Sequence, residues 1–273
     1  MHYTRIAHAG QDDLAFFFSL CVVKSNQNYM KILIVSDIHA NRVALETVLK
    51  DADKFDKVWC LGDVVGYGPE PNECVEILRH LDLLCLAGNH DWAVLDKLDL
   101  EDFNPEARRA ALWTRETLTP ANFNWLIDLP ERVPTQLENF TLIHGSPQHP
   151  IWEYVSTPAV ARVNFQYFET PICLMGHTHV PVVYRYHAAD DRASAEPLPE
   201  NDTLDFGPER MMINPGSVGQ PRDGDRRSSY ALLDTDTMKL THRRVEYDIN
   251  VTQEKMRRVH LPERLIARLS YGW

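Results

Sequence analysis

Five short apolar segments of the chain each end at a cluster of Gly, Asp, Asn or His residues. The clusters are IVSDIH from Ile34, CLGDVV from Cys60, LAGNHD from Leu86, LIHGS from Leu142 and LMGHTH from Leu174. Short apolar runs with such boundaries predict buried β-strands. Because ligands of α/β sheets bind at the carboxyl ends of the strands, the five clusters are expected to converge on one edge.

The segments between the clusters predict an α/β fold with helices packed on a sheet. The first elements are expected to be strands at 31–35, 57–61 and 83–87, with helices at 41–51, capped by Asn41, and at 71–78. Residues 92–129 are expected to be helical, best at 107–118 and 120–129, and 188–208 to form a solvated loop. The later strands have no long helices between them and predict an antiparallel or mixed sheet; they are expected at 140–143, 172–175, 182–187, 211–214, 230–234 and 239–245.

The charge of the chain limits its partners. Its 28 Lys and Arg residues against 39 Asp and Glu residues give a net charge of -11. General nucleic-acid binding and binding to anionic membranes rely on basic patches, so neither is expected. A small phosphorylated substrate stays open, because bound metal ions can reverse the field locally. The sequence leaves the oligomeric state open.

The cysteines and the N-terminal residues favour a cytoplasmic protein. None of the five cysteines forms a CxxC pair, so we interpret them as small apolar residues in a reducing compartment. The apolar run Leu14–Val23 is too short to span a membrane. Asp12 and Asp13 precede it where a secretory signal would be basic. We therefore interpret residues 1–29 as an extension outside the catalytic fold.

The polar clusters supply a set of metal ligands. Asp37 and His39 lie two apart on a segment expected to be extended, so their side chains should leave on one face, and His177 and His179 share this spacing. Asp63, Asn89 and His144 each follow a predicted strand. These donors exceed what one ion requires, and two ions that share a carboxylate would use the whole set. Nitrogen and oxygen donors without thiolate favour Mn²⁺, our first choice, with Fe, Zn²⁺, Co²⁺ and Ni²⁺ as alternatives.

The order D-x-H, G-D, G-N-H-D, H, G-H-x-H resembles the calcineurin-like metallophosphoesterases over residues 30–245. The segments GDVVGYGPEPNECVEILR from Gly62 and NPGSVGQPR from Asn214 are similar to the smaller bacterial and archaeal branch of phosphodiesterases and phosphatases. The resemblance implies an αββα sandwich of two mixed sheets with flanking helices and a helical insertion. Residues 30–273 would form a single domain, in which 92–130 is, as a secondary hypothesis, a flap that helps select the substrate.

The resemblance also implies roles for individual residues. They are Asp37, His39 and His179 on a first metal ion, Asn89, His144 and His177 on a second, Asp63 as the bridge, and His90 as the donor of a proton or hydrogen bond to the leaving oxygen. The larger protein phosphatases orient this histidine with an Asp three residues after the bridging Asp, where this chain has Gly66. Either another carboxylate orients His90, or His90 is a weaker donor.

Two further residues are candidate substrate contacts. Arg222 is the basic residue of NPGSVGQPR, and its guanidinium suits phosphate; the alternative is a surface arginine paired with Asp223 or Asp225. Tyr67 either flanks the substrate or covers its own loop.

The favoured function is a phosphoester hydrolase in which a hydroxide that bridges the two metals attacks phosphorus in line. Phosphodiesters or nucleotide-type phosphoanhydrides are the preferred substrates, with phosphomonoesters as the alternative. The rival is a non-catalytic scaffold on the same fold, like the retromer-type subunit, which lacks the catalytic histidine.

Overall fold

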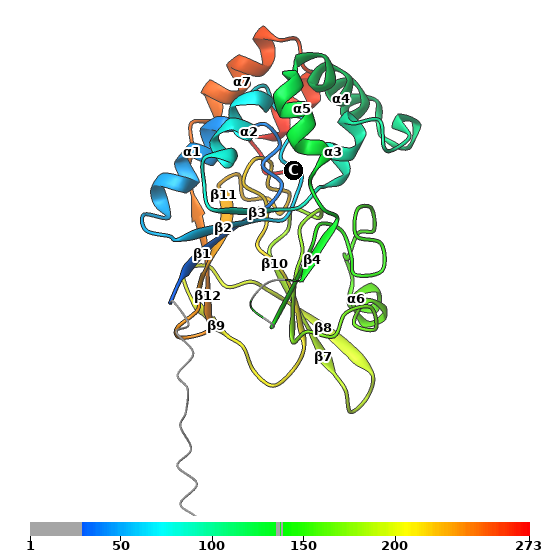
Figure 1. Cartoon of the computed structure of the whole chain (residues 1–273), viewed down its shortest axis with the longest axis vertical. Coiled ribbons are helices and arrows are strands. Elements are labelled where there is room, and N and C mark those ends of the chain that lie inside the picture. The colour runs from blue at the N-terminus through cyan, green and yellow to red at the C-terminus, as the bar shows by residue number, and fades with distance from the viewer. Residues whose placement is uncertain (1–28, 135–136, 138) are drawn as a thin grey trace, which may run out of the picture.

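The computed structural model describes residues 29–134, 137 and 139–273. The predicted extension therefore lies, apart from Tyr29, outside the described residues. The described residues form two six-stranded sheets that face each other, with helices on both outer sides (Figure 1). This arrangement confirms the predicted αββα sandwich of two mixed sheets.

The first sheet has the strand order β3-β2-β1-β11-β12-β9. Its strands are β1 (Lys31–Val35), β2 (Lys57–Cys60), β3 (Leu83–Cys85), β9 (Thr203–Asp205), β11 (Ser228–Asp234) and β12 (Lys239–Val245). The second sheet has the order β4-β5-β6-β10-β7-β8. Its strands are β4 (Arg132–Pro134), β5 (Phe140–Ile143), β6 (Ile172–Leu174), β7 (Val182–His187), β8 (Arg192–Pro197) and β10 (Met211–Asn214).

The helices cover the outer faces of the two sheets. They are α1 (Arg42–Asp51), α2 (Pro71–Arg79), α3 (Asn89–Val94), η1 (Leu100–Asp102), α4 (Pro105–Thr117), α5 (Pro120–Ile127), α6 (Pro158–Asn164), α7 (Ile249–Arg258) and α8 (Glu263–Arg268). The side chain of Asn41 accepts a hydrogen bond from the Ala44 amide at 3.2 Å, so the predicted cap of α1 is confirmed. The structure has no helix, in its described part, that is long and apolar enough to cross a bilayer.

Alternation along the central strands divides the core into layers. Ile32 and Ile34 of β1 join the apolar cluster between the two sheets, whereas Leu33 and Val35 join the cluster beneath the helices. Side chains of a strand point alternately to the two faces of its sheet. Because both faces of this sheet are covered, every side chain of a central strand is buried, and the strand therefore has an unbroken apolar sequence. A third cluster, with Phe165 of the segment after α6, fills the space behind the second sheet.

The parallel strands bring the polar clusters together. Within the first sheet Val35, Cys60 and Cys85 stand in register on three parallel neighbours. In the second sheet β5, β6 and β10 also run parallel. The loops that follow these strands therefore leave from one edge of the sandwich, as predicted.

The prediction of a solvated loop over 188–208 is wrong. Residues Arg192–Pro197 form β8, which pairs antiparallel with β7, and β9 pairs with β12. Both strands lie at sheet edges, where most of their side chains face solvent, so their composition resembles that of a loop. The four described cysteines are free and buried, as expected for small apolar residues.

Candidate active site

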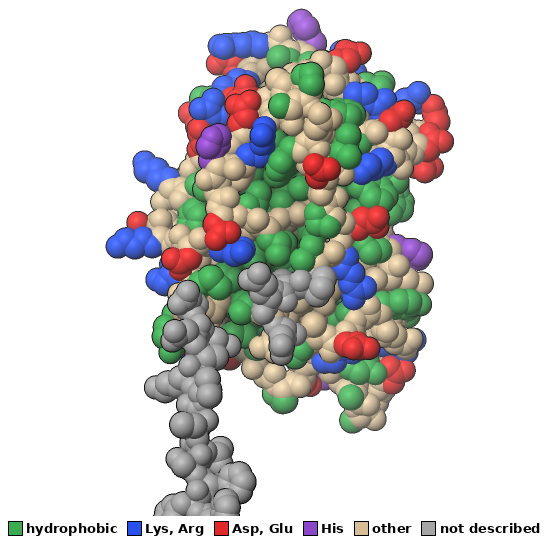
Figure 2. All heavy atoms as spheres, viewed as in Figure 1, with side chains coloured by type: hydrophobic (Ala, Val, Ile, Leu, Met, Phe, Trp, Pro, Cys, Tyr) green, Lys and Arg blue, Asp and Glu red, His purple; other side chains and the backbone are tan. Residues whose placement is uncertain are grey.

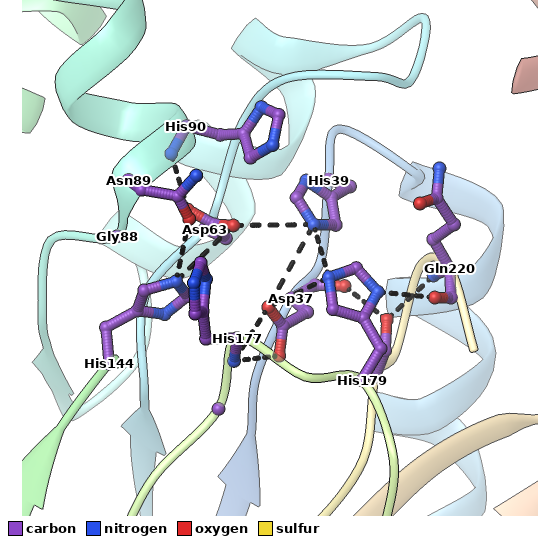
Figure 3. Close-up of polar contacts among 12 residues, drawn as sticks. Asp37, His39, Asp63, Gly88, Asn89, His90, His144, His177, His179 and Gln220 are labelled. Atoms are coloured by element: carbon purple, nitrogen blue, oxygen red, sulfur yellow. Dashed lines mark hydrogen bonds and ion pairs between the residues drawn. The ribbon is translucent and has the colours of Figure 1, made fainter. Parts of the chain in front are cut away.

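All seven predicted ligands lie together at the edge where the strands end, and none of them is more than 3 % exposed (Figure 3). Possible ligand atoms of two groups lie within 4.8 Å of one another: Asp37, His39, Asp63 and His179 form the first group, and Asp63, His144 and His177 the second. Asp63 belongs to both groups. The Oδ1 atom of Asn89 lies 3.1 Å from Nε2 of His144, which adds Asn89 to the second group.

The loops that carry these ligands are not extended, so the prediction of extended D-x-H and H-x-H segments is wrong. Five ligands adopt left-handed conformations, with φ of 53° at Asp37, 49° at His39, 54° at Asp63, 68° at His177 and 61° at His179. Residues with a Cβ rarely adopt this region, which costs on the order of 1 kcal/mol each. Hydrogen bonds between adjacent loops stabilise this left-handed conformation; they include Asp37 N to Gly62 O at 3.1 Å and His39 N to Asp63 O at 3.0 Å.

The segment Asn214–Arg222 clamps the ligand loops from the other side. The amide of Gly219 donates to the Asp37 carbonyl at 3.0 Å, and the Ser217 hydroxyl donates to the same oxygen at 2.8 Å. The side-chain amide of Asn214 donates to the Gly176 carbonyl at 2.6 Å. A Cβ atom at Gly219 would lie 1.8 Å from the carbonyl oxygen of Ile38, so only glycine permits this approach. Sequence reasoning noted this segment but missed its structural role.

Main-chain carbonyls fix the tautomers of the histidines. A carbonyl oxygen only accepts, so the ring nitrogen next to it carries the proton and the other nitrogen keeps a free lone pair. Three rings present Nδ1 to a carbonyl and turn Nε2 toward the site: His39 to Val65 at 3.2 Å, His144 to Leu61 at 2.8 Å and His179 to Gln220 at 2.5 Å. Nε2 is bare in His39 and His179, whereas Nε2 of His144 faces Oδ1 of Asn89. His177 is reversed, with Nε2 at 3.1 Å from the Trp152 carbonyl, which leaves Nδ1 bare.

These bare atoms fit a site for metal ions. The Oδ2 atom of Asp63 is buried, has no hydrogen-bond partner among the described residues, and lies 3.5 Å from Nε2 of both His39 and His144. Buried polar groups without partners are costly, and a cation in contact with them would remove that cost. Imidazole and carboxylate donors without thiolate suit divalent transition metals.

Burial sets the protonation states at the site. It lowers the pKa of His39, His177 and His179 well below the usual range of histidine, so these rings are neutral. Burial alone would raise the pKa of Asp63, but His144 and His90 hold it well below its usual range. Burial raises the pKa of Asp37 to about 7, although His144 opposes the shift. His144 differs from the other ligands: burial would lower its pKa, but the neighbouring Asp63 and then Asp37 raise it to about 9. Neutral imidazoles and ionised carboxylates are the forms that bind metal, so binding of a cation would displace the proton of His144.

His90 stands beside the ligand groups. Its amide donates to Oδ1 of Asp63 at 2.8 Å, and its ring centroid lies 4.1 Å from that of Tyr67 and 5.0 Å from that of His39. The Nδ1 atom of His90 is buried and has no hydrogen-bond partner in the described part of the chain. Burial lowers the pKa of His90 to about 4.

Asp91 does not take the place of the carboxylate that Gly66 lacks. Its side chain accepts hydrogen bonds from three amides, those of Val64 at 3.3 Å, Val65 at 3.0 Å and Gly88 at 2.9 Å. Gly66 has φ of +87°, and a Cβ atom there would lie 2.9 Å from Nδ1 of His90. Asp91 therefore shapes the loops, while Gly66 makes room for the ring of His90.

Arg222 and Tyr67 also lie at the site, although their contact with a substrate stays a prediction. The Arg222 guanidinium lies 5.7 Å from the ring centroid of Tyr67 and donates to Oε1 of Gln220 at 2.9 Å. The alternative, in which Arg222 pairs with Asp223 or Asp225, is not found. Asp223 pairs with Arg244, and Asp225 pairs with Arg227 at 2.6 Å. Tyr67 is only 6 % exposed and contacts both His39 and His90.

Sequence reasoning missed aromatic contacts at the site. The ring of Tyr154 stacks on His177 with centroids 3.7 Å apart. Within the predicted flap, 92–130, Phe103 contacts His90 at 5.4 Å between centroids, and α4 and α5 contact α2. Selection of substrates by this segment stays a prediction. The abundance of aromatic residues after His144 was the available signal for Tyr154.

Comparisons with known proteins agree with this geometry. The model of the calcineurin-like phosphoesterase superfamily domain matches residues 30–238. The crystal structure of a metallophosphoesterase from Sphaerobacter thermophilus has a TM-score of 0.82 and 48% sequence identity, covering 90% of this chain and 100% of that one. An uncharacterized protein of Methanocaldococcus jannaschii is 40% identical over 246 residues, which are 88% of this chain and 98% of that protein. The symmetrical bis(5'-nucleosyl)-tetraphosphatase of Glaesserella parasuis is 27% identical over 139 residues, about half of each chain.

Proposed function

Because the chain belongs to the calcineurin-like phosphoesterase superfamily, it is a phosphoester hydrolase, and we propose that it uses two divalent metal ions to cleave phosphodiesters or nucleotide-type phosphoanhydrides. The main support for two ions is Asp63, whose carboxylate belongs to both groups of donors and leaves Oδ2 without a hydrogen bond. One carboxylate between two sets of bare nitrogen atoms suits a bridge between two cations.

The two groups of donors divide the work of holding the ions. The first ion would take Asp37, His39 and His179, the second would take Asn89, His144 and His177, and Asp63 would lie between them. Two bound divalent ions supply an activated water for attack on phosphorus in line with the leaving group, and positive charge beside the phosphoryl oxygens. Neither group of donors, as found among the described residues, contains a thiolate, which supports Mn²⁺, with Fe, Zn²⁺, Co²⁺ and Ni²⁺ as alternatives.

His90 and the loops around it would act on the leaving group. The ring of His90 lies against Tyr67 and His39, so a phosphoryl group beside the first donor group comes within its reach. Its role would be to donate a hydrogen bond or a proton to the leaving oxygen. Gly66 leaves space for the ring, and no carboxylate of the described residues holds Nδ1, so this donor would be weaker than one paired with an Asp.

Two observations support a small substrate with phosphodiester or phosphoanhydride bonds. The relative from Glaesserella parasuis carries the name of a bis(5'-nucleosyl)-tetraphosphatase. On the face drawn in Figure 2, acidic and basic side chains are interspersed, unlike the basic stripe that long nucleic acids require. The four buried free cysteines support a reducing, cytoplasmic location.

Turnover with confirmed metal content tests this proposal. The whole chain would be loaded with Mn²⁺, analysed for metal, and assayed with bis(p-nitrophenyl) phosphate, a dinucleoside polyphosphate and p-nitrophenyl phosphate. We expect the diester or the anhydride to be cleaved faster than the monoester. His177→Asn should lose this activity, whereas the exposed His80→Gln should retain it. Faster cleavage of the monoester would favour a phosphomonoesterase, and no turnover of any substrate would favour a non-catalytic scaffold.

A further inference from the structure

A cavity of about 490 Å³ lies beside the candidate metal centre. Tyr67, Tyr154 and Arg222 line the side of the cavity next to the ligand loops. Helix α8 and the residues after it supply the opposite side, with Arg264, Arg268, Tyr271 and Trp273. A volume of this size is typical of sites for small organic ligands. The second wall lies outside residues 30–238, so the match to the superfamily domain says nothing of its role.

The second wall is built into the fold. Leu265, Ile266 and Leu269 of this wall are buried in an apolar cluster with residues of α4 and α7. The side chain of Gln253 donates to the Ile266 carbonyl at 2.7 Å and to the Ser270 hydroxyl at 2.8 Å. The Gly224 amide donates to the Gly272 carbonyl at 2.9 Å, which fixes the wall to the loop that carries Arg222. The cavity is therefore held open by packed elements.

The cavity concentrates positive charge in an acidic protein. Among the described residues, no Asp or Glu carboxylate lies within 4.0 Å of the guanidinium of Arg222 or Arg268. Nε of Arg268 donates to the main-chain oxygen of Trp273, which leaves its two terminal nitrogens for a ligand, and Arg264 reaches only Glu106, at 3.7 Å. Burial and the neighbouring Arg222 lower the pKa of Arg268 to about 10, so the two cations oppose each other. An anion between them would relieve this repulsion, and guanidinium groups match the geometry of phosphate.

The cavity also offers aromatic surface. Tyr271 and Trp273 stack on each other with ring centroids 4.9 Å apart, and both remain more than half exposed. Exposed aromatic rings are the usual platforms for nucleobases. Tyr154 links this region to the metal ligands, because its ring stacks on His177.

We propose that the cavity binds part of a nucleoside polyphosphate whose scissile phosphoryl group lies at the metal centre. The part bound in the cavity is the base and the distal phosphate, by which we mean a phosphate group that lies away from the metal ions. Arg222 and Arg268 bind the distal phosphate, and Tyr271 and Trp273 bind the base. This inference rests on the proposed function, since it takes the metal centre as the place of cleavage. It narrows the substrate class to nucleotides with at least one phosphate beyond the bond that is cut.

Calorimetry with two probes tests the assignment without turnover. The probes are α,β-methylene-ADP, which carries a base, and methylenediphosphonate, which carries none, each titrated into the Mn²⁺-loaded chain. We expect the nucleotide to bind at least about tenfold more tightly than the base-free probe. Arg268→Gln should weaken the binding of both probes about tenfold. Trp273→Ala should weaken the binding of the nucleotide more than the binding of the base-free probe.

Matched variants keep this test independent of folding. Arg264 also lines the cavity and adds to its positive charge, and its side chain is 83% exposed. Arg264→Gln should therefore weaken the binding of the nucleotide without lowering the melting temperature. Arg258→Gln removes an exposed arginine of α7 that pairs with Glu254, and it should change the binding of neither probe. Nucleotide binding that is unchanged in both Arg268→Gln and Arg264→Gln would overturn the assignment. Binding as expected with no turnover of any phosphoester would instead overturn the proposed function.

Discussion

His39 and His179 face each other through their Nε2 atoms at 3.1 Å. Behind each ring a main-chain carbonyl holds the proton on Nδ1, so neither Nε2 can donate to the other. Two lone pairs directed at each other in a buried site repel, and a cation between them turns the repulsion into two coordination bonds.

Metal removal should therefore destabilise the protein. A ligand that binds only the folded state at a hundred times its Kd adds about 2.7 kcal/mol to the free energy of unfolding. We expect chelation to lower the melting temperature by several degrees and Mn²⁺ to restore it, as measured by calorimetry with metal analysis. His39→Gln should respond much less to Mn²⁺, while the exposed His80→Gln should respond as the wild type does. An equal response in His39→Gln would contradict this role.

Asp63→Asn should destabilise the protein most when metal is bound. Without metal, Oδ2 of Asp63 lies 3.5 Å from Nε2 of His144, and His144 and His90 hold the pKa of Asp63 well below its usual range, so the ionised carboxylate stabilises the metal-free fold. We expect the metal-free variant to unfold at a lower temperature than the metal-free wild type. With Mn²⁺ the difference should be larger, because the variant should bind fewer ions, and kcat should fall at least about a hundredfold. A variant that binds and responds to Mn²⁺ as the wild type does would contradict the role of Asp63 as a bridge.

The central strands and the site residues could be predicted because one local signal, an apolar run that ends at a polar cluster, marks both the strand and the ligands. Strands β1, β2, β5 and β6 are apolar runs that end at a polar cluster, and each was predicted to within one residue of its bounds. Parallel pairing then brings the clusters together, whatever the structure of the rest of the chain. The positions of the seven ligands depend only on this edge.

The parts that escaped prediction depend on contacts between distant residues. The left-handed conformations of Asp37 and His39 are held by carbonyls of the loop after β2 and by Gly219, which spacing along the chain cannot reveal. Helices α7 and α8 are short, and the burial of Met256 and Leu265 depends on their packing against α4. The cavity wall they form was therefore invisible in the sequence.

His90→Gln should reveal whether His90 assists the leaving group. A donor to the leaving oxygen matters most when the leaving group is a poor one. We expect kcat to fall about a hundredfold for a nucleotide or alkyl ester and by less than about tenfold for a p-nitrophenyl ester. Metal content should be unchanged, because His90 belongs to neither group of donors. Equal losses with both leaving groups would point to a role in binding alone.

Asp91→Asn should be mainly a stability variant. Its carboxylate accepts from the amides of Val64, Val65 and Gly88, and an Asn side chain keeps a single acceptor oxygen. The amides left without a partner should cost about 2–4 kcal/mol in the free energy of unfolding. Urea unfolding measures this loss, and the metal content of the folded fraction should stay as in the wild type. A variant of normal stability with reduced turnover would instead place Asp91 in the chemistry.

His242 should make the protein less stable in acid independently of the metal site. Its ring is 1 % exposed, Nε2 lies 2.7 Å from the Ser229 hydroxyl, and burial and then Arg244 lower its pKa to about 4. An unfolded histidine has a pKa of about 6.5, so between these two values the unfolded chain binds a proton that the folded chain lacks. The stability that neutral His242 contributes is complete above about pH 6.5 and declines as the pH falls toward about 4.

For His242→Gln, we expect the loss of stability relative to wild type to shrink by about 2 kcal/mol between neutral pH and about pH 5 in urea unfolding. His80→Gln should show no such convergence, and a loss in His242→Gln that is constant with pH would mean that the buried ring does not resist protonation.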